Sequence, residues 1–353
     1  MRIVVGMSGG VDSAVAAALL QERGCEVAGC YLKVAIPGAP CPWADDLPMA
    51  HRVAAALNIP LIVRDVSAAY ERDVLEPMLS AYAVGETPNP DTTCNRWVKF
   101  DALRSVAREV GAPRIATGHY ARLRLSAGGS IELLRGTDPK KDQSYFLWML
   151  TQEQAAQTEF PLGGRLKIDV RAEAHRRGLP NWDRSSTSGV CFLGAIHLAT
   201  FLQERLPPRP ARVVTTTGEE IGSVPNALAY TIGQRLSLGG QPTARYVVAQ
   251  RLATQELIVS AFPNDAQRAT QIFHAQQPHW IGAAPTMPLR AMVRVRHRQE
   301  SIRGTIALHG DGLRIDCDVP IVGVAPGQAA VMDDGERVFG GAVIEHCDTD
   351  IPG

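Results

Sequence analysis

Residues 2–13 read Arg2-Ile3-Val4-Val5-Gly6-Met7-Ser8-Gly9-Gly10-Val11-Asp12-Ser13, and this stretch decides the fold. Its apolar start is typical of a buried strand. From Val11 the apolar residues recur at helical spacing, and Gly24 is a residue type that often ends a helix. A strand, a glycine-rich turn and a helix N-terminus direct backbone N–H groups and the positive end of the helix dipole at one point. The stretch therefore predicts a phosphate-binding loop at the start of an α/β fold.

The same alternation of short β-rich runs and longer helical runs continues outward to about residue 120. We expect strands at 26–33, 61–66 and 114–117, and helices at 45–57, 70–83 and 96–110. This order predicts a parallel sheet with crossover helices. Residues 122–135 alternate apolar and polar side chains around a Ser-Ala-Gly-Gly turn, which predicts a hairpin inserted on the α/β core. Further helices are expected at 143–157 and 170–177.

Helical periodicity ends after the proline-rich stretch 206–210, and short Val/Ile/Thr runs with glycine turns follow. We place the α/β domain that bears the phosphate loop, the candidate catalytic domain, at 1–207. A central β-rich domain is expected at 208–275, and a C-terminal β domain at 276–353.

Composition limits the function classes. The 353 residues are 45% hydrophobic and 20% charged, which excludes a disordered or fibrous protein. Lys plus Arg equals Asp plus Glu at 36 each, so a nucleic acid would need a local basic patch. One candidate is the arginine stripe Arg290, Arg294, Arg296, Arg298 and Arg303, which is equally consistent with a solvated strand.

The N-terminal apolar run is too short for a signal peptide, and no apolar run reaches the length of a membrane span. We therefore expect a cytoplasmic protein with no membrane partner. The seven cysteines are scattered and show no CxxC spacing, which argues against a disulfide scaffold, a zinc ribbon or an iron–sulfur cluster. No metal site is assigned.

The phosphate loop matches neither the GxxxxGK[ST] nor the GxGxxG pattern, because it has no lysine and a different spacing. It resembles the SGGxDS loop of the PP-loop ATP pyrophosphatases, which bind ATP, release pyrophosphate and leave an adenylate on the substrate. The loop alone leaves open tRNA thiolases, lysidine synthase, amidotransferases similar to GMP synthetase, and argininosuccinate synthetase.

Two cysteines lie in turn-rich polar stretches. Cys94 precedes an expected helix, so we expect an accessible side chain whose thiolate the helix dipole favours. Asp91 is suited to act as a general acid or base beside it. Cys191 ends a Ser/Gly-rich stretch at 185–194. Each cysteine is also compatible with a buried structural role.

Six motifs occur in the order that is known from the tRNA-specific 2-thiouridylase family. They are TPNPDxxCNxxxKF at 87–100, ATGHY at 116–120, KDQSYFL at 141–147, GVCFLG at 189–194, YTIGQR at 230–235 and PGQ at 326–328. The chain resembles this family over nearly its whole length. Members replace the 2-carbonyl oxygen of the wobble uridine, position 34 of certain tRNAs, with sulfur and use ATP. The resemblance implies an α/β PP-loop domain of the adenine nucleotide alpha hydrolase type, a small central β domain and a C-terminal β-barrel.

The resemblance also implies roles for individual residues. Cys94 would be the nucleophile and Cys191 the persulfide carrier, with Ser186 standing where relatives usually carry an acidic residue. The ATP contacts would be Gly6, Met7, Ser8, Gly9, Gly10, Val11, Asp12, Ser13, Leu32 and Gly118. The target base would meet Asn89, Pro90 and Asp91, and tRNA would meet His119, Lys141, Asp142, Gln143, Arg296, His297 and Gln328.

The implied cofactor is ATP with Mg²⁺, without a tightly bound organic cofactor. The implied partners are tRNAs such as the Lys, Glu and Gln acceptors, and a persulfide donor from a cysteine desulfurase system.

The chemistry of thiolation explains why such an enzyme needs both an ATP-binding loop and two cysteines. A carbonyl oxygen leaves only after it has been converted to an adenylate, which requires ATP. Sulfur then arrives as a persulfide, and a second thiol resolves the linkage and leaves a disulfide. Two alternatives stay open: a PP-loop ligase or amidotransferase that uses nitrogen and would not need the cysteines, and a non-catalytic RNA-binding protein.

Overall fold

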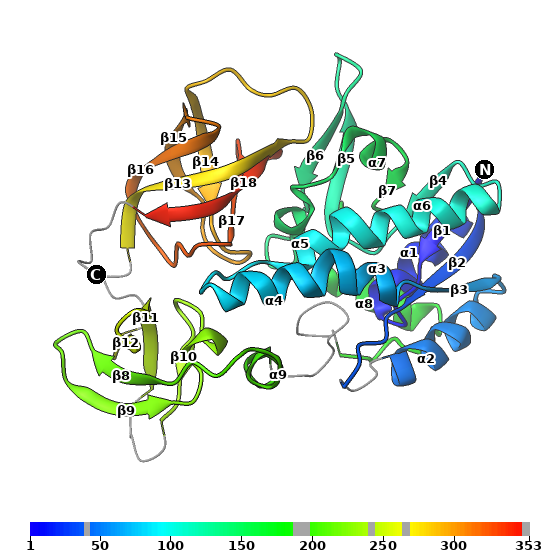
Figure 1. Cartoon of the computed structure of the whole chain (residues 1–353). Helices are drawn as coiled ribbons and strands as arrows, with labels where there is room; N and C mark the ends of the chain where they lie inside the picture. The colour runs from blue at the N-terminus through cyan, green and yellow to red at the C-terminus, as the bar shows by residue number, and fades with distance from the viewer. Residues whose placement is uncertain (39–42, 186–197, 239–243, 263–268, 348–353) are drawn as a thin grey trace.

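The structure is a computed structural model, and it describes residues 1–38, 43–185, 198–238, 244–262 and 269–347. An α/β unit occupies one side of the molecule, and two β units lie against it (Figure 1). Each of the three units has its own sheet and its own share of the buried core. The expected α/β unit, central β unit and C-terminal β unit are therefore confirmed.

The N-terminal sheet is parallel throughout and has the order β3-β2-β1-β4-β7. Its strands are β1 (Arg2–Gly6), β2 (Glu26–Lys33), β3 (Leu61–Asp65), β4 (Arg114–Ala116) and β7 (Thr158–Glu159). The first four confirm the predicted strands. The sequence did not reveal β7, because two residues carry no alternation pattern. The strand order reverses between β1 and β4, and ligands of open α/β sheets bind at such a point.

Helices cover both faces of this sheet, as the alternating side chains of β1 require. Ile3 and Val5 pack with α1 (Val11–Glu22) and α8 (Lys167–Arg176), whereas Val4 packs on the opposite side with α6 (Phe100–Glu109). The helix α2 (Trp43–Ala56) lies beside β2 and β3. The first loop is thus held between a buried strand and a buried helix.

Two long helical segments each contain a π-helical turn. The first runs through α3 (Ser67–Tyr70), η1 (Glu71–Leu75) and α4 (Glu76–Ala83). The second runs through α5 (Pro90–Cys94), η2 (Asn95–Lys99) and α6, so it begins six residues before the predicted start at 96. Pro90 at the first helical position and the Asn89 side chain, which accepts from the Asp91 N–H at 3.1 Å, explain the earlier start.

The single helix predicted at 143–157 is wrong. The segment forms a 3₁₀ turn, η3 (Ser144–Leu147), and then the short helix α7 (Gln152–Ala156). Thr151 and Gln154 form a reciprocal capping box that starts the second helix. Tyr145, Leu147 and Trp148 are all buried. The segment is therefore apolar because it is surrounded by protein on several sides, and not because it presents one apolar face of a helix.

The predicted hairpin forms as β5 (Ala121–Leu125) and β6 (Ile131–Arg135), and its Ala121 and Leu133 pack in one cluster with Val4 and Leu103 of the α/β core, as expected. It pairs with β18 (Arg337–Cys347) of the C-terminal unit, with Leu133 opposite Val338. Both of these residues are buried, so the pairing makes an apolar contact between the hairpin and β18. The hairpin thus joins the first unit to the last.

The central unit follows α9 (Leu198–Arg205). Its sheet has the order β10-β11-β12-β8-β9, with β12 and β8 parallel. The strands are β8 (Ala211–Thr215), β9 (Glu220–Val224), β10 (Arg235–Leu236), β11 (Arg245–Arg251) and β12 (Glu256–Ser260), and η4 (Ala227–Ala229) lies between β9 and β10.

The C-terminal unit is a closed antiparallel barrel, because β13 pairs with both β16 and β18. Its strands are β13 (Ala269–Trp280), β14 (Leu289–Arg294), β15 (Ile302–His309), β16 (Gly312–Val322), β17 (Ala329–Asp333) and β18. This confirms the expected barrel. The domain boundary expected between residues 275 and 276 lies inside β13.

Candidate active site

The phosphate loop joins β1 to α1 and has the backbone geometry that an anion requires. Gly9 adopts a φ of +75°, and a side chain there would meet the Asp46 carbonyl oxygen at 2.5 Å. Gly10 caps α1 without a side-chain acceptor, so the first N–H groups of the helix remain available to a ligand. The Ser13 hydroxyl accepts from the Ser8 N–H at 3.2 Å and donates to the Gly10 carbonyl at 3.0 Å. These hydrogen bonds fix the backbone conformation of the loop.

The loop is anchored by groups from distant parts of the chain. Asn181 and Arg184 both donate to the Gly9 carbonyl oxygen, at 2.9 and 3.3 Å. Gly118 packs against the loop so closely that a side chain there would lie 2.8 Å from the carbonyl carbon of Asp12. Burial, followed by the nearby Asp12 carboxylate, raises the pKa of Tyr120, whose hydroxyl donates to Asp12 at 2.8 Å.

These contacts bring the expected ATP residues together. Gly6 to Ser13 form the loop, Gly118 supports it, and Leu32 lies two residues beyond Cys30, whose carbonyl accepts from the Met7 N–H at 2.8 Å. An open helix N-terminus with close backbone approach fits a nucleotide phosphate. Sequence reasoning missed Tyr120, Asn181 and Arg184; Tyr120 alone lay within a quoted motif.

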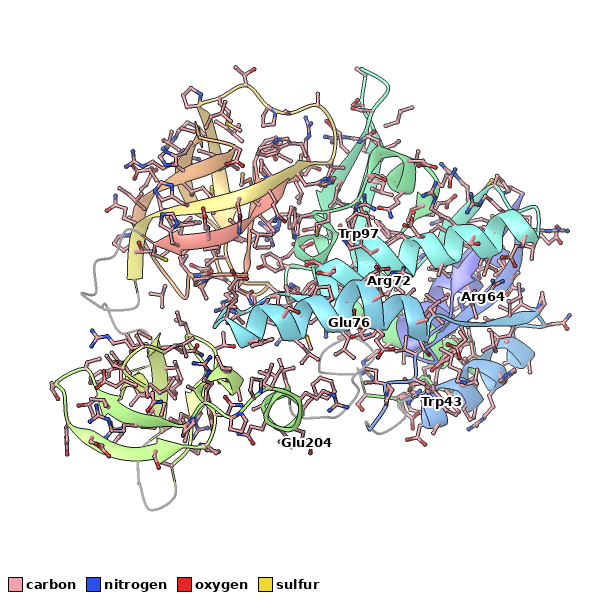
Figure 2. All side chains as sticks on the ribbon, viewed as in Figure 1. Trp43, Arg64, Arg72, Glu76, Trp97 and Glu204 are labelled. Carbon is pink, nitrogen blue, oxygen red and sulfur yellow. The ribbon has the colours of Figure 1, made fainter. Side chains whose placement is uncertain are left out.

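The helix that begins at Pro90 turns Cys94 inwards. The expected accessible Cys94 is wrong, because its side chain is 0% exposed and packs in the apolar cluster of Phe100 and Leu103. Trp97, three residues later, is 47% exposed on the outer surface, with the Arg96 guanidinium 3.9 Å from its ring centroid (Figure 2). Cys94 also ends the first short helix and does not precede it, so the dipole argument for its thiolate loses its basis.

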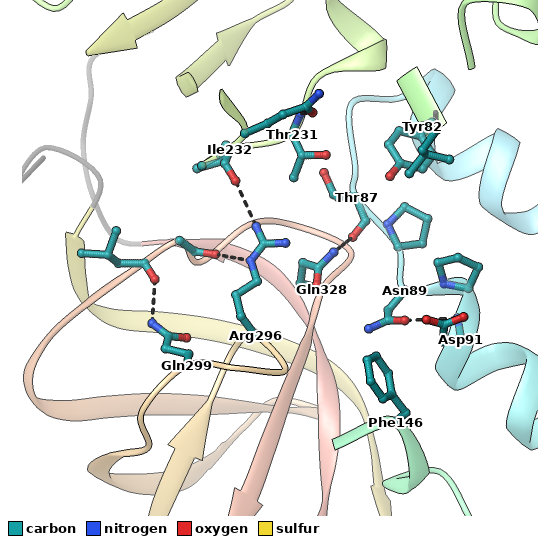
Figure 3. Close-up of a pocket in the computed structure, with 17 residues that line it drawn as sticks. Tyr82, Thr87, Asn89, Asp91, Phe146, Thr231, Ile232, Arg296, Gln299 and Gln328 are labelled. Atoms are coloured by element: carbon teal, nitrogen blue, oxygen red, sulfur yellow. Dashed lines mark hydrogen bonds between the residues drawn. The ribbon is translucent and has the colours of Figure 1, made fainter. Parts of the chain in front are cut away.

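A cavity of about 610 Å³ opens at the N-terminus of this helix, where all three units meet (Figure 3). Its floor includes Asn89, Pro90 and Asp91. The remaining walls come from Tyr82, Thr87, Pro88, Phe146, Leu198, Thr231, Ile232, Gly233, Gln234, Arg296, Gln299, Val322, Gly323 and Gln328. The structure therefore brings the three expected base-contacting residues together with two expected tRNA contacts, Arg296 and Gln328.

Side-chain bonds to backbone carbonyls tie the cavity walls together. Arg296 donates to the Gly323 oxygen of the barrel and to the Ile232 oxygen of the central unit, both at 3.1 Å. Gln328 donates to the Thr87 oxygen at 2.6 Å. Sequence reasoning missed Phe146 and the wall at 231–234 as cavity residues, although both lay in the quoted motifs.

Asp142 lies in a buried ion-pair network beside the cavity. Its carboxylate accepts from the Gly136 and Ser144 N–H groups at 3.0 Å and contacts Arg294 at 3.1 Å. Arg294 also contacts Asp333 at 3.3 Å. Burial works to raise the pKa of Asp142, but the Gly136 N–H and the Arg294 guanidinium hold it below its usual value. A nucleic acid cannot reach Asp142 without breaking this network.

The two expected histidines lie in different places. His119 stacks on Phe100 at 6.0 Å between ring centroids, and burial lowers its pKa well below the usual value. His297 lies against Phe146 with the ring centroids 4.4 Å apart, and burial lowers its pKa to about 4. Both rings are therefore neutral at pH 7. Of the neighbouring residues, Lys141 is half-buried, and Gln143 accepts from the Tyr120 N–H at 3.0 Å.

Cys191 and Ser186 lie outside the described residues. Within the described residues, no group of three His, Cys, Asp or Glu side chains is arranged to hold a metal ion. Among those same residues, no helix is both long and apolar enough to cross a membrane.

Comparisons with known proteins agree with this architecture. A family model described as the tRNA methyl transferase HUP domain matches residues 1–195. Models of a tRNA methyl transferase PRC-barrel domain and an aminomethyltransferase beta-barrel domain match residues 199–261 and 270–344.

The chain is also similar to curated proteins named tRNA-specific 2-thiouridylase MnmA. It is 39% identical to the protein of Lactococcus lactis subsp. cremoris and 41% identical to that of Pseudomonas fluorescens, each over 98% of this chain and 94% of the relative. The identity to the Salmonella typhimurium protein is 40%, over 98% of this chain and 96% of that one. With its phosphate loop, three-unit architecture and full-length similarity, the chain belongs to the tRNA-specific 2-thiouridylase family.

Proposed function

We propose that the protein is a tRNA-uridine 2-sulfurtransferase that uses ATP to thiolate the wobble uridine, position 34. The observation that carries the proposal is the cavity at the start of α5. It places Asn89, Pro90 and Asp91 beside residues of the central and barrel units, in the part of the chain that also bears Cys94. The full-length similarity to 2-thiouridylases supports the same reaction.

The phosphate loop holds ATP in this proposal. Backbone N–H groups at the α1 N-terminus bind the phosphates, and Gly9 and Gly118 allow the close approach. Mg²⁺ enters with the nucleotide, and no residue of this chain is assigned to it.

The cavity receives the target base. Phe146 offers an aromatic face, and Asn89 and Asp91 offer polar groups in the same cavity. The uridine 2-oxygen attacks the α-phosphorus of ATP, a new P–O bond forms, and pyrophosphate leaves. Asp91 is the candidate general acid or base for the proton transfers that accompany thiolation.

Sulfur delivery uses the two cysteines. The terminal sulfur of a persulfide on Cys191 attacks C2 and displaces AMP. Cys94 then attacks the Cys191 sulfur of the resulting linkage, which frees 2-thiouridine and leaves a Cys94–Cys191 disulfide for an external thiol to reduce. The burial of Cys94 supports a requirement that substrate binding exposes it.

The partners in this proposal are wobble-uridine tRNAs such as the Lys, Glu and Gln acceptors, and a persulfide donor of the cysteine desulfurase system.

The domains divide near residue 207 and before β13 at residue 269. A cut at 275 would divide a strand that pairs on both sides.

The experiment is a reconstitution with purified protein, tRNA, ATP and a persulfide donor. Pyrophosphate release and 2-thiouridine, identified by mass spectrometry of the digested tRNA, are both expected. Cys94→Ser and Cys191→Ser should abolish 2-thiouridine and retain pyrophosphate release, and Asp91→Asn should slow the chemical step more than tRNA binding. Pyrophosphate release with another modified nucleoside would indicate a different PP-loop ligase. Tight tRNA binding without pyrophosphate release would indicate a non-catalytic RNA-binding protein.

A further inference from the structure

Lys167 lies against the phosphate loop although it is far from it in the sequence. Its ammonium group forms an ion pair with Asp12 in the loop and lies 5.8 Å from the centroid of the Tyr120 ring. The loop itself contains no lysine or arginine. A side-chain cation that contacts the phosphates would therefore come from elsewhere in the fold.

The backbone holds Lys167 firmly at this place. Lys167 is the first residue of α8, and its N–H donates to the Asp138 carboxylate at 2.9 Å. Val170 and Ala174 on the same helix are fully buried in the cluster that contains the α1 residues. The start of α8 is thus fixed relative to the start of α1.

The contacts of Lys167 leave room for a second anion. An ammonium group has three N–H donors, and a single carboxylate oxygen uses one of them. The Lys167 side chain is only 12% exposed, whereas Asp12 is 33% exposed, so the pair lies at the base of an open loop. Asp12 also accepts from the Tyr120 hydroxyl at 2.8 Å, and it keeps that partner if the ammonium group turns away.

Arg184 is another described cation that contacts the loop, and two of its guanidinium nitrogens already have acceptors. Its guanidinium binds the Gly9 carbonyl and forms an ion pair of 2.6 Å with Asp46. Arg184 thus shapes the loop backbone. Of the two side chains, Lys167 is the better placed to donate hydrogen bonds to a phosphate group that gains negative charge during the reaction.

We propose that Lys167 is a catalytic residue that binds the pyrophosphate leaving group. This inference rests on the proposed function. As the uridine oxygen bonds to the α-phosphorus, the bond from that phosphorus to the bridging oxygen breaks, and its electron pair goes to pyrophosphate. Lys167 donates hydrogen bonds to this growing negative charge. Such a contact strengthens in the transition state and therefore accelerates the step.

The test measures the binding of pyrophosphate and of AMP, each alone, to the full-length protein by calorimetry. Lys167→Met should weaken pyrophosphate binding about tenfold or more, as the loss of a charge-assisted hydrogen bond does. AMP binding should stay within about twofold, because AMP lacks the leaving group. Lys167→Arg should restore most of the pyrophosphate affinity. The control is Lys140→Met, at an exposed lysine outside the loop, which should leave both affinities unchanged.

A second variant separates direct binding from mere support of Asp12. Tyr120→Phe removes the other Asp12 partner and should change pyrophosphate binding by less than about twofold. If Tyr120→Phe and Lys167→Met weaken pyrophosphate equally, or if Lys167→Met weakens AMP as much as pyrophosphate, Lys167 only supports the loop and the proposal is wrong. Unchanged pyrophosphate binding in Lys167→Met would also refute it. A wild-type protein that binds ATP, AMP and pyrophosphate not at all would overturn the proposed function as well.

Discussion

Residues 6–13 alone form the phosphate loop, whereas the cavity takes its walls from α4, α5, η3, the central unit and the barrel. The loop binds through backbone groups that a short local pattern sets. The cavity depends on how three separately folded units meet. Substitutions should therefore damage the loop through backbone displacement and the cavity through loss of support between units.

The largest effect is expected for Arg294→Met, which removes the cation between Asp142 and Asp333 in the wall beside the cavity. Arg294 is 1% exposed, so the change leaves two buried carboxylates with Arg135 alone, 3.1 Å from Asp142 and 4.0 Å from Asp333, as the cation they still share. The free energy of unfolding at pH 7 should fall by about 3–5 kcal/mol. Denaturant titration measures it. A loss below about 1 kcal/mol would contradict the view that this network supports the cavity.

The pH dependence of this loss follows from the two carboxyls. Asp142 has a folded pKa below its unfolded value, so its contribution is present above the unfolded pKa and is lost as pH falls through the folded pKa. Burial raises the pKa of Asp333, whose contribution is present at low pH and is lost as pH rises. Without Arg294 both folded pKa values rise. The destabilisation should therefore shrink as pH falls from 7 towards 4, because protonated carboxyls need no counter-ion.

On the loop side, Gly118→Ala should give the next largest effect. The added methyl group would lie 2.8 Å from the Asp12 carbonyl carbon and 2.9 Å from the Ser13 nitrogen, so the loop backbone must shift. A displacement of about 1 Å at a reacting centre can cost about 100-fold in rate. Pyrophosphate release should fall by about that factor, while tRNA affinity stays within about twofold. The control is Gly128→Ala in the β5–β6 turn, where the added atom meets one neighbour at 3.9 Å.

Equal loss of adenylation and tRNA binding in Gly118→Ala would show that the two regions are not independent. Normal pyrophosphate release would show that the loop tolerates displacement.

The difference between the two regions also explains what the sequence could predict. The strand, loop and first helix at 2–22 were predicted correctly, because the apolar spacing and the glycines act locally. The hairpin at 121–135 was predicted as an element on the α/β core, but its pairing with the barrel was not predicted, since its partner β18 lies some 200 residues away. Phe146 lay in the KDQSYFL motif and Lys167 in no quoted motif, and neither was singled out, because their roles depend on tertiary contacts.

Cys94 shows the same limit on a smaller scale. The turn-rich sequence around it indicated exposure, but Asn89 and Pro90 start the helix early and turn the cysteine into the core. A helix start that moves by six residues therefore reverses the exposure of a candidate nucleophile.

A smaller effect is expected for Phe146→Ala in the cavity. The Phe146 ring lines the cavity and rests on His297 at 4.4 Å between centroids, so it can serve as a platform for the target base. Stacking on an aromatic ring contributes about 1–3 kcal/mol per base, and we expect tRNA affinity to fall about tenfold. Filter binding with tRNA measures it, and Phe146→Tyr should retain most of the affinity. Unchanged binding in Phe146→Ala would place the base elsewhere.

The smallest effect is expected for Arg296→Ala. The Arg296 guanidinium donates to carbonyl oxygens of the barrel and the central unit, so it joins two cavity walls. Its removal should weaken the binding of all tRNAs by about three- to tenfold, because the loss of two partly buried hydrogen bonds to carbonyls costs about 1 kcal/mol net. The slope of log affinity against log salt should change by less than about one, since a residue that holds carbonyls releases no counter-ion from phosphate. Binding at several salt concentrations measures both quantities, with Arg298→Ala as the matched exposed arginine. If the slope falls by a full unit in Arg296→Ala, Arg296 contacts a tRNA phosphate. The cavity would then keep its shape without the Arg296 hydrogen bonds to the barrel and the central unit.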